Sequence, residues 1–139
     1  MNGCHFCENT GGEILWEDDR CRVVWAYEPD YAALCRVIWD RHVSEMTDLE
    51  PAGRDHMMRV VFATERALVA VLKPDKMNLA SLGNQVPHVH WHVIPRFRDD
   101  PHFPNPIWGQ KLRATPRPLE AEFATHMRRT LDGLLKRRG

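Results

Sequence analysis

The segment from His88 to Ile94 constrains the fold most strongly, because histidine and apolar residues alternate along it. It reads His-Val-His-Trp-His-Val-Ile. Successive side chains of a β-strand point to opposite faces of a sheet. The segment therefore predicts a strand that presents His88, His90 and His92 on one face, about 6–7 Å apart, and an apolar row on the other. The chain holds eight histidines, so chance is a poor explanation for three at strict period two.

The rest of the chain combines short apolar segments with two stretches of helical periodicity. One predicted helix begins at Pro51 and stops before Pro74, and a second begins near Leu119 and ends in the basic residues 136–139. Residues 96–118, rich in proline and charge, are expected to run over the surface. Four further segments predict strands: 14–16, 21–27, 34–39 and 77–82. Without regular βαβ alternation, this pattern predicts an α+β domain with a mainly antiparallel sheet.

Length and charge limit the possible partners. The 139 residues fit a single domain spanning 1–139. Lys plus Arg and Asp plus Glu both number 19, so the formal net charge is +0. This balance argues against a long nucleic acid or an anionic membrane as partner and leaves a small anionic substrate open. The N-terminus lacks the apolar run of a signal peptide, and charges interrupt every apolar segment, which predicts a cytoplasmic protein without a membrane span.

In such a compartment the four cysteines are expected to be reduced. Cys21 and Cys35 lie in apolar, strand-like surroundings and are interpreted as small core residues. Cys4 and Cys7 form a C-x-x-C pair, which is either two structural thiols or half of a zinc site that two histidines complete.

Two kinds of chemistry fit a row of imidazoles. Neutral imidazole nitrogens bind zinc. Alternatively, one imidazole attacks phosphorus and forms a phosphoramidate, while its neighbours donate hydrogen bonds to the phosphoryl oxygens. The spacing alone does not separate these two interpretations.

The histidine row resembles the signature of the histidine triad (HIT) family, in which three histidines alternate with apolar residues. Residues 95–97, Pro-Arg-Phe, follow it as in many members. Residues 17–21, Glu-Asp-Asp-Arg-Cys, resemble the segment between the first strands of the family, and residues 37–38 and 42–43 resemble its next strand and the histidine after it. The similarity covers about residues 4–97.

The resemblance implies a five-stranded antiparallel sheet with the two helices, usually in a homodimer whose sheets join. It also implies a nucleotidyl hydrolase or transferase that acts at the α-phosphorus of a dinucleoside polyphosphate, a phosphoramidate or an adenylated small molecule. By position, His90 would be the nucleophile, His92 would contact the phosphate and His88 would support the geometry. Asn78 and His42 lie where members place a phosphate-contacting or orienting Asn and a further site histidine.

The sequence departs from the family pattern in the loop before the histidine row. This loop reads Gly-Asn-Gln-Val-Pro over residues 83–87 and lacks the usual hydroxyl that would touch the leaving group. An amide of Gln85 or Asn84 is expected to replace that contact.

A second departure concerns the ribose. Ala26 stands where members carry an Asp for the ribose hydroxyls, so Glu28 or Asp30 would have to reach them instead. Trp25 and Tyr27 flank this position and could stack on a base, although strand aromatics more often pack in a core.

Some relatives have a zinc site built from residues like Cys4, Cys7, His42 and His88, so the resemblance makes these four residues candidate ligands of a structural zinc. The reaction itself would require no cofactor. The remaining histidines are interpreted as surface or helix-face residues without a role: His5, His56, His102 and His126. Arg96 and Arg98 could help to neutralise a polyphosphate, although an exposed loop arginine is usually only solvated. Two other functions stay open, a nucleotide sensor with little turnover and a zinc-dependent hydrolase. The second lacks a carboxylate beside the histidine row that could act as general base.

Overall fold

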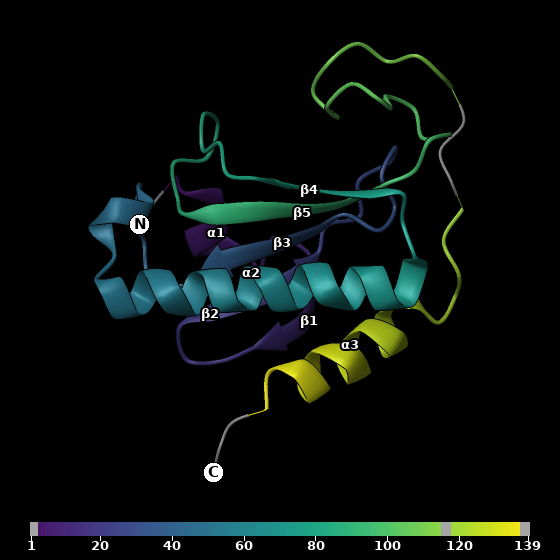
Figure 1. Ribbon diagram of the computed structural model, residues 1–139. Helices are drawn as coiled ribbons and strands as arrows, with labels where there is room; N and C mark the ends of the chain where they lie inside the picture. The colour runs from purple at the N-terminus through teal and green to yellow at the C-terminus, as the bar shows by residue number, and fades with distance from the viewer. Residues whose placement is uncertain (1–2, 115–117, 137–139) are drawn as a thin grey trace.

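The computed structural model describes residues 3–114 and 118–136 and contains one five-stranded antiparallel sheet (Figure 1). The strands are hydrogen-bonded in the order β1-β2-β3-β5-β4. Their bounds are β1 Glu13–Glu17, β2 Cys21–Trp25, β3 Cys35–Trp39, β4 Lys76–Ala80 and β5 His90–Arg96. The α+β architecture and the antiparallel sheet predicted from the sequence are confirmed.

The order of the strands brings distant segments together. The first three strands form a meander, and β3 then pairs with β5, with Arg36 opposite His92 and Ile38 opposite His90. The edge strand β4 pairs with the other side of β5. Residues some fifty positions apart therefore become neighbours on one face of the sheet.

Helix α2, Pro51–Leu72, has the predicted bounds, with Pro51 in its first turn. Helix α3, Phe123–Leu134, begins later than the sequence suggested, and residues 137–139 of its expected basic end lie outside the described residues. The described residues also contain two short elements that were not predicted, α1, His5–Glu8, and the 3-10 turn η1, Met46–Asp48.

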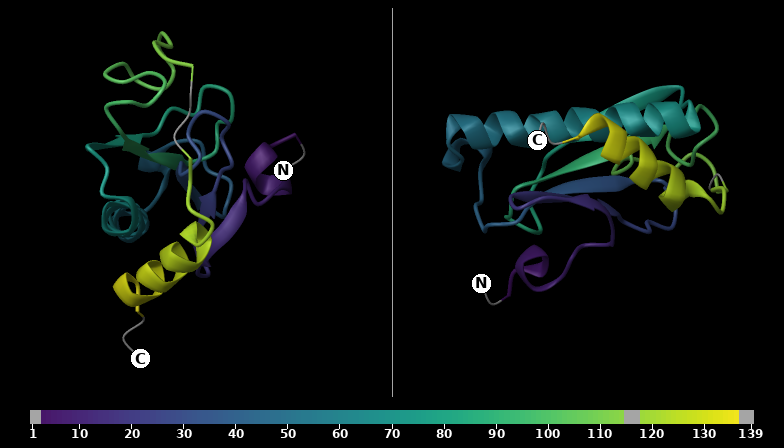
Figure 2. Two further views of the ribbon diagram at one scale, coloured as in Figure 1. Left: turned by 90° about the vertical axis from the view of Figure 1, so that its right-hand side faces the viewer. Right: turned by 90° about the horizontal axis from the view of Figure 1, so that it is seen from below.

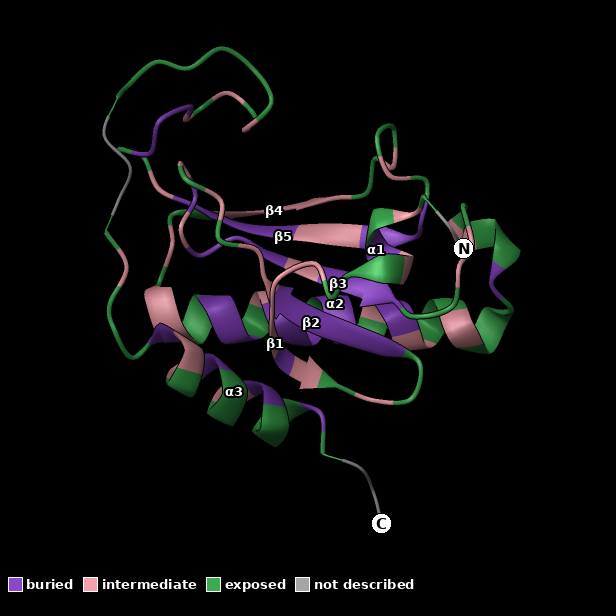
Figure 3. Ribbon diagram, turned by 180° about the vertical axis from the view of Figure 1, so that it is seen from behind, coloured by how far each residue is buried: buried purple, intermediate pink, exposed green. Residues whose placement is uncertain are grey.

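The elements form three layers (Figure 2). Helices α2 and α3 cover one face of the sheet, and α1 lies against the opposite face. The main core lies under α2 and α3, where Val23, Val37 and Val93 pack against apolar residues of both helices. Smaller apolar clusters lie on the other face around Phe6 and Tyr31. Most residues of the central strands β2, β3 and β5 are accordingly buried (Figure 3).

Two further details of the prediction are wrong. Strand β5 begins at His90 instead of His88, because the backbone at Val89 bonds irregularly to Val43 and Trp39 before the regular ladder starts. Residues 96–118 do not simply cover the surface, since Arg96, Asp100 and His102 are buried.

A helix that could cross a bilayer is missing from the described part of the chain, since none there combines the necessary length and apolarity.

Candidate functional site

His90 and His92 lie side by side on the face of β5 that points away from α2. Their ring centroids are 5.1 Å apart. Val89, Trp91 and Val93 pack toward the core under α2, as the alternation predicts. The period-two pattern thus places two imidazoles on a face that α2 and α3 leave uncovered.

The tautomer of His90 follows from its hydrogen bond. Its Nδ1 is 2.6 Å from the backbone oxygen of His88. A carbonyl oxygen only accepts, so Nδ1 carries the proton and donates, and the lone pair of the neutral ring resides on Nε2. Burial lowers the pKa of His90. The ring is therefore held as a neutral imidazole with a nucleophilic nitrogen.

His92 is adapted to the neutral form as well. Burial, followed by electrostatic interactions with His90 and Arg36, lowers the pKa of His92 to about 4. Its Nδ1 is buried and finds no hydrogen-bond partner among the described residues. Its ring contacts Trp108 edge-on, with 5.0 Å between centroids. A buried ring nitrogen without a protein partner is available to a ligand.

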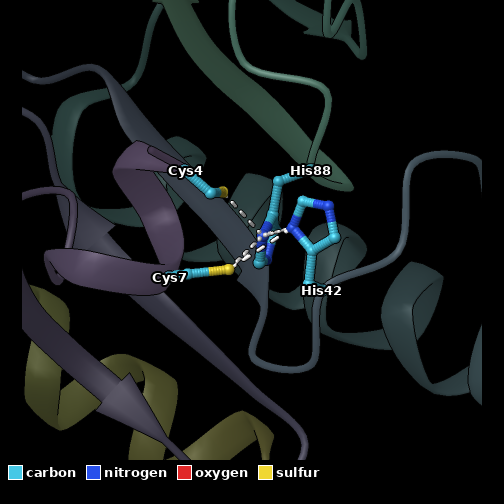
Figure 4. A group of neighbouring side chains, drawn as sticks. All are labelled: Cys4, Cys7, His42 and His88. Carbon is cyan, nitrogen blue, oxygen red and sulfur yellow. Dashed lines mark hydrogen bonds between the residues drawn. The ribbon is translucent and has the colours of Figure 1, made fainter. Parts of the chain in front are cut away.

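His88 turns away from this pair and joins a cluster with Cys4, Cys7 and His42 (Figure 4). The thiols point from α1 and its N-terminal flank toward the two imidazoles. The Nδ1 atom of His88 is 3.4 Å from Cys4 Sγ and 3.2 Å from His42 Nδ1, and Cys7 Sγ is 3.3 Å from His42 Nδ1. All four ligand atoms lie within 4.8 Å of one another.

These distances fit a tetrahedral zinc ion. Zn–S bonds of about 2.3 Å and Zn–N bonds of about 2.0 Å give S···N and N···N edges of about 3.3–3.6 Å. The Nε2 atom of His88 donates to the backbone oxygen of Trp39, so its Nδ1 presents a lone pair to the thiols. The two thiols and two imidazoles, together with the hydrogen bond that orients His88, therefore suit zinc.

Phe6 connects the cluster to the histidine pair. It lies on α1 between Cys4 and Cys7, and its ring contacts His90 edge-on at 4.7 Å and His88 at 6.0 Å. Sequence reasoning missed this residue, because only the fold brings α1 onto the sheet.

A pocket of about 220 Å³ opens beside His92. The loop between β2 and β3 lines one side, and Ile107 and Trp108 line another. The pocket also exposes Arg36, which sequence reasoning did not single out. It combines apolar walls with polar groups next to the histidines, as small-molecule sites do.

The predicted phosphate-binding amides come from β4 and from the loop that precedes β5. Asn78 of β4 stands opposite Ile94, on the same sheet face, and its Oδ1 accepts a hydrogen bond of 2.8 Å from Arg96. Because Arg96 occupies Oδ1 of Asn78, the Nδ2 group of Asn78 remains as a donor for a ligand. Asn84 and Gln85 are exposed in the loop that precedes β5.

The residues considered for the nucleoside are largely engaged with one another. Glu28 pairs with Arg36 at 2.9 Å, and Asp30 pairs with Lys111 at 3.2 Å. Trp25 and Tyr27 stack at 4.2 Å, and Trp25 also packs against the core. Both acids line the pocket beside His92.

Arg96 and His102 belong to a buried network, which corrects their interpretation as surface residues. Arg96 is 2% exposed and bonds to both carboxylate oxygens of Asp100, at 2.8 and 3.1 Å. Tyr31 Oη lies 2.8 Å from His102 Nδ1 and 3.2 Å from Asp100. Burial alone would raise the pKa of Asp100, but hydrogen bonds from Arg96 and two backbone amides lower it to about 2. The network fixes the segment that carries Trp108.

The other histidines lie away from the pair. His5 is exposed, His126 pairs with Glu120, and Arg98 is exposed as expected. His56 is only partly exposed and pairs with Asp18 at 2.7 Å near Cys21, the second group of potential metal ligands among the described residues.

The comparisons with known proteins agree with the resemblance seen in the sequence and with the fold. The family model "HIT domain" matches residues 8–99. The curated relative adenylylsulfatase HINT3 from Arabidopsis thaliana is 28% identical over 109 residues, which are 72% of this chain and 55% of the relative. The chain thus spans about half the length of the curated relative it matches.

Solved structures share the fold. A histidine triad protein from Bradyrhizobium japonicum has a TM-score of 0.75 at 27% identity, covering 88% of this chain and 92% of that one. One from Marinobacter aquaeolei VT8 has a TM-score of 0.70 at 26% identity, covering 91% and 90%. A Zn-bound histidine triad family protein from Mycobacterium smegmatis has a TM-score of 0.67 at 25% identity, covering 95% of both chains.

Proposed function

Given that the chain belongs to the histidine triad (HIT) family, we propose that it hydrolyses or transfers nucleotidyl groups through a covalent intermediate on His90. The candidate substrates are dinucleoside polyphosphates, nucleoside phosphoramidates and adenylated small molecules. All three place an α-phosphate on the histidine.

The hydrogen bond from His90 Nδ1 to the backbone oxygen of His88 carries this proposal. It leaves the lone pair of the neutral ring on Nε2, the state that a nucleophile requires. In the first step Nε2 forms a bond to the α-phosphorus, and the bond from phosphorus to the leaving group breaks. In the second step water or another acceptor attacks phosphorus, and the bond to Nε2 breaks.

The neighbouring groups then stabilise charge on the phosphoryl oxygens. His92 lies beside His90, and we assign it a hydrogen bond to the phosphate in both steps. The Nδ2 group of Asn78 is a further donor on the same face. Asn84 or Gln85 would contact the leaving group from the loop before β5. His88 orients the nucleophile through its backbone oxygen, and its ring belongs to the Cys/His cluster.

We place the nucleoside in the pocket beside His92. Trp108 and Ile107 offer apolar contact to a base, and Glu28 or Asp30 could accept from ribose hydroxyls if its present ion pair opens. The adenylylsulfatase name of the plant relative makes adenylated compounds the first substrates to test.

Cys4, Cys7, His42 and His88 would hold a structural zinc. When bound, zinc would supply a closed tetrahedral crosslink between α1 and the segments that carry the two histidines. His42 is assigned to this crosslink because its Nδ1 faces the thiol of Cys7.

We also propose a homodimer in the cytoplasm. Strand β4 lies at the edge of the sheet, and α2 exposes Phe62 and Val69, which are 56% and 44% accessible. A second copy that covers this strand and helix would extend the sheet and bury these side chains. All four cysteines are free thiols, as in a reducing compartment.

Replacing His90 by Asn tests the nucleophile. Asn retains a hydrogen-bonding side chain but cannot form the phosphoramidate, so we expect turnover of diadenosine polyphosphates or adenylyl sulfate to fall by several orders of magnitude. Nucleotide affinity should remain largely unchanged. Near-normal turnover by His90→Asn would refute the proposal.

A sensor that binds nucleotides without turnover is the second candidate. The buried, unpartnered Nδ1 of His92 fits ligand binding in either case. A wild type that binds nucleotides and cleaves none of the candidate substrates would favour the sensor.

A further inference from the structure

Three arginines from three strands lie on the sheet face that carries His90 and His92. Two of them are committed elsewhere. Arg22 bonds to Asp40 at 2.7 Å and to three backbone oxygens, and Arg96 is held by Asp100, Asn78 and a backbone oxygen. Arg36 is different, because part of its donor capacity is unused.

The hydrogen bonds of Arg36 are few. Its Nε is buried and has no partner among the described residues. Its Nη1 reaches the backbone oxygen of Gly11 only at 3.4 Å, and its Nη2 pairs with Glu28 at 2.9 Å. The Glu28 side chain is 42% exposed, so this ion pair can open at little cost. A buried guanidinium N–H without an acceptor indicates that a ligand supplies one.

Arg36 is also placed beside the reacting groups. It is the direct cross-strand partner of His92, whose Nδ1 is likewise buried without a partner. Its guanidinium lies 5.9 Å from the ring of Phe6, which in turn contacts His90. Both Arg36 and His92 line the pocket of about 220 Å³. The two buried nitrogens without partners, Arg36 Nε and His92 Nδ1, thus belong to neighbouring residues of one pocket.

We propose that Arg36 is a phosphate-binding residue, whose guanidinium hydrogen-bonds to phosphate oxygens of a nucleotide held beside His92. The planar guanidinium matches two oxygens of a phosphate group, and its charge is permanent. His92 is neutral at pH 7 because burial lowers its pKa to about 4, so the positive charge at the phosphate comes from Arg36. Glu28 holds the guanidinium in place until the phosphate arrives.

This inference rests on the proposed function for its ligand, yet it is tested by binding alone. AMP and adenosine share base and ribose and differ in the phosphate. We expect the wild type to bind AMP more tightly than adenosine in calorimetry. Arg36→Gln should weaken AMP binding about 10- to 100-fold and change adenosine binding less than about 2-fold. Arg36→Lys should recover part of the lost AMP affinity, because lysine keeps the positive charge. The recovery should be incomplete, because the ammonium group lacks the planar geometry of the guanidinium.

Two further variants separate phosphate binding from a merely structural ion pair. Glu28→Gln removes the partner of Arg36 but keeps the guanidinium, so the ratio of AMP to adenosine affinity should stay the same or rise. Arg20→Gln, at an exposed side chain outside the site, should leave both affinities unchanged.

The outcomes are distinct from those for the nucleophile. Loss of adenosine and AMP binding in equal proportion in Arg36→Gln would overturn the proposal, as would a wild type that binds AMP no better than adenosine. The wild type could cleave none of the candidate substrates while Arg36→Gln selectively loses affinity for AMP. In that case Arg36 is still the phosphate-binding residue, but of a sensor.

Discussion

Phe6 packs edge-on against His90, with ring centroids 4.7 Å apart, and is flanked along the chain by Cys4 and Cys7. A ligand that holds the two thiols in place therefore also holds Phe6 against the ring of the proposed nucleophile. The Cys/His cluster thus has a geometric link to the reaction, although its ligands would take no part in the chemistry.

The first prediction concerns this link. Protein purified without chelator should contain about one zinc per chain, and Cys4→Ser should lose it, because three ligands no longer close the tetrahedron. The melting temperature should fall by several degrees and turnover should fall with it, as α1 and Phe6 detach from the sheet. Elemental analysis, calorimetry and a rate assay measure the three effects.

His5→Ala is the matched control, since His5 is exposed on the same short helix. It should keep the metal, the melting temperature and the rate. Freshly purified wild type without zinc would contradict the assignment of the four ligands.

The second prediction concerns the titration of His92. Its imidazole should titrate near pH 4 in the nuclear magnetic resonance spectrum, because burial comes first among the causes that lower its pKa, followed by His90 and Arg36. Arg36→Gln should raise this pKa by removing a positive charge. A titration of His92 in the usual range of histidine would contradict the buried, neutral ring.

The lowered pKa also determines how His92 affects stability. The unfolded chain takes up the proton near the usual histidine value and the folded chain only near pH 4, so between these values the unfolded state binds more protons. The contribution of His92 to the free energy of unfolding is therefore lost as the pH falls from the usual histidine pKa toward 4, and it is fully present above that range. Chemical unfolding of wild type and His92→Asn at several pH values should show a shallower acid decline in the variant.

The third prediction concerns the buried pair of Arg96 and Asp100. Asp100→Asn leaves a buried guanidinium without its carboxylate, so the free energy of unfolding should fall by about 3–5 kcal/mol. Asp30→Asn breaks an exposed pair and should cost less than about 1 kcal/mol. The two variants are compared by urea unfolding at the same protein concentration and with saturating zinc. Equal losses of unfolding free energy would contradict the stabilising role of the buried network.

The fourth prediction concerns assembly. Light scattering should give twice the chain mass of 16.2 kDa. Phe62→Glu on the exposed face of α2 should shift the mass toward one chain, since a charge is costly in an apolar interface. The same substitution leaves the histidine face untouched. A wild type that stays at one chain mass across a wide concentration range would refute the dimer.

Local periodicity was sufficient to predict the strand that carries the histidine pair and the long helix that packs behind it. The alternation from residue 88 onward predicted the two faces of β5, and the helical period predicted α2 from its first to its last turn. The strand starts late because backbone contacts of Val89 with Val43 and Trp39, which no local pattern encodes, replace the ladder at His88. The ring of His88 is therefore turned from the row toward the thiols.

The groups that sequence reasoning missed depend on long-range pairing. Arg36 lies beside His92 only because β3 pairs with β5, and a single arginine in an apolar strand gives no local signal. Arg96 and His102 looked like surface residues in a proline-rich stretch, but Asp100 and Tyr31 supply buried partners for them. The ligand set of the cluster could be anticipated only through resemblance to a family, since Cys4 and His88 are 84 positions apart.

The covalent intermediate on His90 is the central claim, and intact-protein mass spectrometry tests it most directly. The protein is mixed with a dinucleoside polyphosphate or adenylyl sulfate, and the reaction is quenched within the first turnover under conditions that preserve phosphoramidates. The intact mass of the protein is then measured. We predict one added adenylyl group, mapped by peptide sequencing to His90 and missing in His90→Asn. A substrate that is turned over without any adduct, or an adenylyl group on another residue, would contradict the account.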